Sequence, residues 1–359
     1  MIIRFIKKHS KNLYIFFLFL SLVLFFFSTD KVYAKSFNIK NIEVSKPFEI
    51  NFDKNKVIDE GFIKAFSELV FLITVSSDHK IIKKIKLNQI KGMIESFSIK
   101  EEKFIDEIYY VNLGVSFNKK KILNFLEKKN IFPSIPIKKK FLFIPIIIEE
   151  NKDNLLVFSN NKFYDEWNND SESFDLIEYI LPTEDLEDLN LIKKQFNFIE
   201  QYDFKEITSK YYLDDSIVAL IFINQKTIRI LSRITVNNKV VLINQSFSNI
   251  DINNTDQLST ITKSLKIIYE DYWKNFNQIN TSIKLPISIK VNSRDNSNVS
   301  RLENTLDEVN LIYDYYISKF DKDFIYYQII YNGTPDIFLK SMENRNFNFN
   351  TQNKTWVLK

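Results

Sequence analysis

Hydrophobic residues follow two different spacings along this chain, and the spacings predict helices in some stretches and strands in others. In residues 57–73 they recur every three or four positions, which is the period of a helix with one buried face. In residues 109–117 they alternate with mostly smaller or polar residues, which is the period of a half-buried strand. Residues 141–148 are almost continuously apolar, which is typical of a strand covered on both faces.

These patterns divide the chain into units that mix helices with strands, and the predicted fold class is α+β. The predicted boundaries are residues 1–34, 35–150, 151–282 and 283–359. The first stretch is a leader, and the two units after it are each predicted to be α/β.

The last unit has the clearest pattern. Its two helices are predicted to begin at Ser300, which is spaced from Glu303 as a capping box, and at Thr334, which a proline follows. The order strand, helix, strand, strand, helix, strand is that of a ferredoxin-like plait. We therefore expect a four-stranded antiparallel sheet with both helices on one face, whose edge strands could accept a strand of a partner.

Residues 1–34 have the plan of a secretory signal peptide. A basic segment with Arg4 and Lys11 is followed by a charge-free apolar run that begins at Ile15 and ends at Phe27. This run of 13 residues is shorter than the ~20 that a helix needs to cross a bilayer. We predict cleavage after Ala34 and a location in the periplasm; the alternative is an uncleaved segment that anchors the protein to the inner membrane.

Charge excludes one class of partner. Without residues 1–34, which hold five basic residues and one acidic residue of the chain's 49 and 45, the chain carries 44 charges of each sign. A neutral chain has no overall field that attracts nucleic acid. The predicted partner is therefore an unknown protein or ligand of the cell envelope, with membrane contact only in transit through residues 15–27.

Composition removes several kinds of chemistry. The chain has no cysteine, and its four glycines are isolated, so thiol catalysis, lipid acylation and glycine-rich phosphate loops are excluded and no cofactor is predicted. His79 is the single histidine after residue 34. A Ser-His-Asp triad would have to use it, but the sequence favours a solvated loop between two helices.

An acidic run formed by Glu184, Asp185, Glu187 and Asp188 is the one candidate site. Carboxylate oxygens could bind a hard cation such as calcium. Acidic residues also stabilise the first turn of a helix, and Asp185 is suited to cap one, so we favour the helix start. The lysine runs at 119–121 and 138–140 could contact anionic lipid head groups, but solvated flanks of a helix and a strand are favoured.

A resemblance to a known family rests on several short stretches: residues 107–117 with 123–131, 141–148, 156–167, 181–188 and 210–214. The last two resemble the family's Pro-Leu-Gly-Asp-Leu-Glu-Asp turn and its Arg-Tyr-Gly-Ala-Asp segment. Glu184 and Tyr212 stand where the family has glycine. The family is an uncharacterised proteobacterial group of exported proteins, the domain of unknown function numbered two thousand and sixty-six. The resemblance implies fold and export, and no activity.

Taken together, these observations predict an exported, non-catalytic module for binding or for assembly in the cell envelope. The alternative is a carboxylate-dependent hydrolase, since paired Asp and Glu residues suffice for such chemistry. An enzyme should bring two carboxylates together in a pocket, whereas a binding module should expose an apolar patch. A third possibility is a scaffold tethered by an uncleaved helix.

Overall fold

The fold is known from a computed structural model, which describes residues 37–149, 152, 154–168 and 175–359. The predicted signal peptide and its cleavage point lie outside the described residues. Residues 37–359 form one unit that contains three sheets. The first and third sheets each have one hydrophobic core, and the second has a core on each face. The class is α+β, as the sequence predicts.

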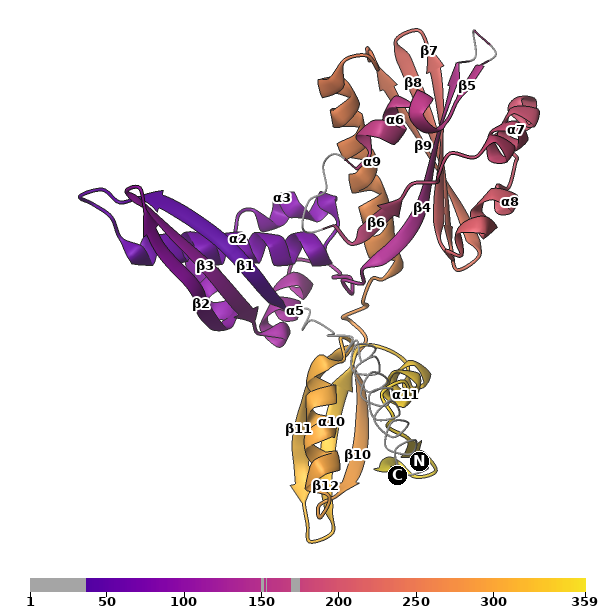
Figure 1. The fold of residues 1–359 in the computed structure, drawn as a ribbon. Coiled ribbons are helices and arrows are strands. Elements are labelled where there is room, and N and C mark those ends of the chain that lie inside the picture. The colour runs from indigo at the N-terminus through magenta and orange to yellow at the C-terminus, as the bar shows by residue number, and fades with distance from the viewer. Residues whose placement is uncertain (1–36, 150–151, 153, 169–174) are drawn as a thin grey trace, which may run out of the picture. The chain divides into compact units, whose positions relative to one another are not determined.

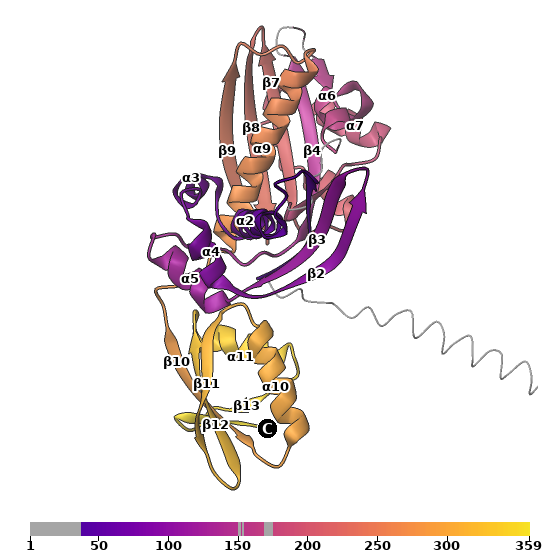
Figure 2. The same ribbon diagram turned by 90° about the vertical axis from the view of Figure 1, so that its left-hand side faces the viewer.

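The first sheet has the order β1-β3-β2 and is antiparallel throughout. Its helices share one core with β1 and β3, and α2 lies along the sheet (Figures 1 and 2). Because neighbouring strands are antiparallel, this unit differs from the α/β unit that the sequence predicts. The elements are β1 (Asn38–Pro47), α2 (Lys54–Ile73), α3 (His79–Ile82), α4 (Leu87–Met93), β2 (Ile94–Ile105), β3 (Ile108–Phe117) and α5 (Lys119–Glu127).

The second sheet has the order β5-β4-β7-β8-β9, and β6 pairs with the other end of β4. The strands β4 and β7 are parallel, and β7, β8 and β9 form an antiparallel meander. The strands are β4 (Lys139–Glu149), β5 (Asn154–Leu156), β6 (Ile177–Ile180), β7 (Ser216–Asn224), β8 (Thr227–Val236) and β9 (Lys239–Ser248).

Helices cover both faces of this second sheet, so β4 contributes to two cores. Phe143 faces the core that includes α9 (Thr255–Phe276) and α6 (Lys162–Glu166), while Ile144 faces the core that includes α7 (Leu186–Lys194) and α8 (Lys205–Thr208). The prediction of a strand buried on both faces is confirmed. The predicted boundary at residue 150 assigns β4 to the N-terminal unit. This assignment is wrong, because β4 pairs with β7 rather than with a strand of the first sheet.

The third sheet has the order β11-β12-β10-β14-β13, with α10 and α11 in the same core. The elements are β10 (Leu285–Asn292), α10 (Asn296–Glu308), β11 (Ile312–Phe320), β12 (Phe324–Tyr331), α11 (Pro335–Glu343), β13 (Phe349–Asn350) and β14 (Thr355–Leu358). Thr334 caps α11 as predicted. The start of α10 is earlier than predicted, because Asp295 rather than Ser300 provides the cap.

The end of the third sheet departs from the ferredoxin-like plait that the sequence predicts. The predicted sheet has four antiparallel strands, whereas this one has five, and β14 runs parallel to β10. The short β13 takes the edge position first, and the chain then reverses into β14. This reversal turns the direction of the last strand, which explains the parallel pairing.

The described helices have one further property that concerns location. None of them is both long enough and apolar enough to cross a membrane.

Candidate functional site

The acidic run lies at the start of α7, where Asp185 is the N-cap residue. Its carboxylate accepts a hydrogen bond from the backbone N–H of Glu187 at 2.8 Å, and this bond is the main cause that lowers the pKa of Asp185. Glu187 and Asp188 occupy the first turn, where the helix dipole stabilises negative charge. Glu184 lies before the helix and accepts from the N–H of Ser159 at 3.2 Å. The helix-start interpretation of this run is therefore confirmed.

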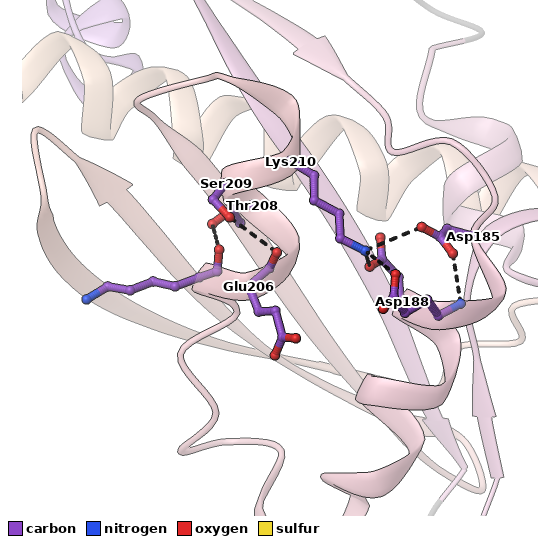
Figure 3. A network of polar contacts seen from close by, with 8 residues as sticks. Asp185, Asp188, Glu206, Thr208, Ser209 and Lys210 are labelled. Atoms are coloured by element: carbon purple, nitrogen blue, oxygen red, sulfur yellow. Dashed lines mark hydrogen bonds and ion pairs between the residues drawn. The ribbon is translucent and has the colours of Figure 1, made fainter.

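Lys210 completes the cluster, and sequence reasoning missed it. Its Nζ lies 2.6 Å from Asp188 Oδ1, 3.2 Å from Glu187 Oε2 and 3.4 Å from Asp185 Oδ2. Figure 3 shows the lysine reaching from the turn after α8 to the first turn of α7. The hydrogen bond to Asp188 is the main cause that raises the pKa of Lys210. The ammonium group thus occupies the place at which three carboxylates converge.

Asp188 is the buried member of this cluster, with 1% of its side chain exposed. Its Oδ2 has no hydrogen-bond partner and Asp188 borders a cavity of about 10 Å³, which is room for about one water molecule. The cavity walls are otherwise mostly apolar and include Ile144, Tyr164 and Ile207. The described residues contain no group of three His, Cys, Asp or Glu side chains arranged to hold a metal ion. The cluster therefore joins α7 to the segment after α8, and it has no space for a substrate.

His79 is placed differently from the prediction. It lies in the short helix α3 and is partly buried, rather than in a solvated loop, and burial lowers the pKa of its imidazole. The nearby Ser76 hydroxyl donates to Asp271 Oδ2 at 2.5 Å. His79 Nε2 is buried without a hydrogen-bond partner. Because the serine pairs with the aspartate and not with the imidazole, these three residues do not form a catalytic triad.

Glu270 is a buried carboxylate that sequence reasoning missed. It lies in α9 with 3% of its surface exposed, and its Oε1 accepts the backbone N–H groups of Leu176 and Ile177 at 2.9 and 2.8 Å. Burial raises the pKa of Glu270 to about 7. Its neighbour Lys274 donates to the carbonyl of Phe71. Glu270 directly follows Tyr269 and lies one turn before Trp273, and this context gives no local signal that a glutamate is buried. Its role here is to hold the start of β6 against α9.

The lysine runs are bonded within the chain instead of being fully solvated. Lys119 donates to the carbonyl of Val309 at 2.8 Å, and burial lowers the pKa of Lys119 to about 8. Lys120 pairs with Asp314. In the second run, Lys139 pairs with the buried Asp215 at 3.0 Å and Lys140 pairs with Glu178. These ion pairs and hydrogen bonds of Lys119, Lys120, Lys139 and Lys140 stabilise the fold.

The edge strands of the three sheets differ in how they are protected from pairing with another chain. Natural edges are blunted by charged side chains, proline, bulges or shortness. The edges β1, β2 and β11 each have at least one register shift and charged side chains, and β5, β6 and β13 have two to four residues. The edge β9 has ten residues in regular register with β8. After Lys239, β9 carries no charge.

Three consecutive aliphatic residues near the start of β9 are exposed. The exposed fractions of Val240, Val241 and Leu242 are 51%, 38% and 56%. Figure 2 shows β9 as the outermost strand of the second sheet, beyond β8. Among the edges that the structure describes, β9 therefore combines length, regularity and exposed apolar residues, and it has no charge, proline or bulge after Lys239.

The hairpin that joins β8 to β9 determines which backbone groups face outward. Asn237 and Asn238 both have positive φ, as in a two-residue type I′ turn. The residues on either side of such a turn, Val236 and Lys239, form a hydrogen-bonded pair, and bonding then alternates along the strand. The N–H and C=O groups of every second residue from Val240 onward thus face away from β8, ready to pair with an added strand.

Comparison with known proteins does not identify a family for this chain. No protein-family model and no curated protein sequence matches the chain.

Proposed function

We propose that this chain is an exported, non-catalytic module for binding or assembly in the cell envelope, and that it accepts an extended segment on the edge strand β9. The observation that carries the proposal is the unprotected edge of β9, where about five residues present unpaired backbone groups. In strand addition, main-chain hydrogen bonds supply affinity, and alternate side chains supply specificity. The aliphatic residues Val240 and Leu242 lie on one face of the strand and would pack against such a segment.

The acidic run and the buried Glu270 support binding over the hydrolase alternative. A hydrolase needs carboxylates that converge on a pocket large enough for a substrate. The carboxylates of Asp185, Glu187 and Asp188 surround Lys210, and the cavity that Asp188 borders measures about 10 Å³. The buried Glu270 is engaged by two backbone N–H groups. Both arrangements serve the fold.

Export is the second part of the proposal, and it rests on the basic segment and short apolar run in residues 1–34. The family resemblance also implies export, and one position agrees with that resemblance. Tyr212 adopts a φ of 51°, the left-handed conformation that favours glycine, and the resembling family has glycine there. Glu184, the other replaced glycine, has no positive φ. Intact-mass measurement on periplasmic protein should show a chain that starts at Lys35; recovery only at full length in membranes would contradict export.

Strand addition is tested by cross-linking in intact cells. A photoreactive amino acid at Leu242 should form adducts that disappear when Asn244 is also replaced by proline, because proline removes an outward N–H group. The matched control is Ile317 on β11, which is 53% exposed against 56% for Leu242 but lies on a protected edge. Equal adducts at the two positions, or adducts at Leu242 that survive Asn244→Pro, would contradict the proposal.

A further inference from the structure

We infer that the segment received by β9 is the β9 strand of a second copy of this chain, paired antiparallel about a two-fold axis at Asn244. The inference rests on the proposed strand addition and names its partner. A two-fold axis places each residue opposite its mirror position, so residues i and j pair when they lie equally far from Asn244. The two second sheets would then join into one continuous sheet.

The absence of charge in β9 is the first argument for a second copy. Self-pairing brings like side chains together, and like charges directly opposite each other destabilise a strand pair. Residues 240–248 carry no charge, and the axis at Asn244 sets Lys239 opposite Asn249 rather than opposite another lysine. The edge β2, with Glu101, Glu102 and Lys103 in sequence, has no such neutral stretch.

The alternation of side chains is the second argument. Residues at equal distance from Asn244 are separated by an even number of positions, so each pair lies on one face of the joined sheet. Val241 then lies opposite Phe247 of the second copy, on the face toward α9, where Phe247 already packs against the core. Leu242 lies opposite Ser246, and the two Asn244 amides meet on the axis.

Backbone hydrogen bonding selects this register over its neighbours. The outward groups belong to residues at even positions from Val240 to Ser248, and an axis at Asn244 pairs all of them, with about ten hydrogen bonds. An axis at Ile243 shortens the overlap and gives about eight. An axis at Leu242 gives about six. The axis at Asn244 also covers the three most exposed aliphatic residues of the strand, which are Val240, Val241 and Leu242.

The absence of cysteine allows a direct test, because any cysteine that is introduced is the single thiol of the chain. In Asn244→Cys, the two Cα atoms across the axis would lie about 5.5 Å apart, within the range that a disulfide spans. Under mild oxidation we expect most of the purified protein to migrate as a covalent dimer on a non-reducing gel. The matched control is Val240→Cys on the same face, whose Cα atoms would lie roughly 27 Å apart and should not cross-link.

A second measurement does not depend on a disulfide. Sedimentation equilibrium of the unmodified chain should give twice the mass of one chain, Leu242→Lys should give the mass of one chain, and Ile317→Lys should remain dimeric. Circular dichroism of each variant checks that the fold is kept. A single-chain mass for the unmodified protein at the highest attainable concentration, with no Asn244→Cys dimer, overturns the inference.

The two proposals fail separately. A monomeric purified chain whose Leu242 position still cross-links to a different protein in cells would keep strand addition and reject the second copy. Cross-linking at Val240→Cys instead of Asn244→Cys would reject the register. Loss of both the dimer and the cellular adducts would reject strand addition itself.

Discussion

Replacing Gly61 by alanine should destabilise the protein, although alanine is the better helix former. Gly61 lies inside α2, and a Cβ built on it would meet Leu113 Cδ1 at 2.3 Å. Leu113 lies in β3 and is fully buried, so its side chain has little space to move. Gly61 thus allows α2 to approach the sheet closely.

Two opposing effects set the magnitude for Gly61→Ala. In a helix interior, alanine is favoured over glycine by about 1 kcal/mol. Overpacking a close-packed core costs about 1–3 kcal/mol. The expected net loss of unfolding free energy is therefore up to about 2 kcal/mol.

Gly92 provides the matched control, because it also lies in a helix, α4, but a Cβ there would meet nothing within 4 Å. Neither glycine has a positive φ, so alanine fits the backbone at both positions. Gly92→Ala should then stabilise the protein by up to about 1 kcal/mol. The same substitution is expected to have opposite signs at the two positions.

Urea unfolding followed by far-ultraviolet dichroism measures both changes, since a shift in midpoint at constant slope reports a change in stability. The double variant Gly61→Ala, Leu113→Ala removes the overlapping methyl group. In the Leu113→Ala background, Gly61→Ala should become neutral or stabilising, which is a measurable coupling between the two positions. If Gly61→Ala stabilises the protein as much as Gly92→Ala does, the close approach of α2 to β3 is refuted.

Three further outcomes are expected. Asp185→Ala should lower the melting temperature, while Asp185→Asn, which keeps a capping oxygen, and added calcium should leave it unchanged; a calcium-dependent rise that Asp185→Ala removes would favour a cation site. Burial raises the pKa of Glu270 from 4.5 to about 7, so the stability that its protonated form contributes is fully present below pH 4.5 and is lost as the pH rises through 7. In urea unfolding at a series of pH values, Glu270→Gln should reduce the loss of unfolding free energy over this range by about 3 kcal/mol. An unchanged pH dependence in this variant would contradict the burial of Glu270 as the cause. A fragment of residues 281–359 should melt cooperatively, because the third sheet has its own core and the Asn332 side-chain amide donates hydrogen bonds to the carbonyls of Thr281 and Ile283. A disordered fragment would contradict this expectation.

Elements whose signals lie within a few residues follow from the sequence. Thr334 and the proline after it start α11, and Asp185 starts α7, because a cap needs only the next three residues of the same helix. The continuous apolar run of β4 likewise predicts a strand covered on both faces. In the same way, the uncharged sequence of β9 is visible without a structure.

Contacts between distant segments were decided by the tertiary structure. An apolar run does not specify which strand it pairs with. The pairing of β4 with β7 therefore depends on which strands compete for the edge of β4. The same holds for the reversal that makes β14 parallel to β10. Lys210 meets Asp188 only because α7 and the segment after α8 pack on the same face of the sheet. The same holds for β9: its sequence shows that it is uncharged, but only the strand order shows that it is an edge. Local capping and periodicity are fixed by short-range geometry, whereas partners and edges result from the packing of the whole chain.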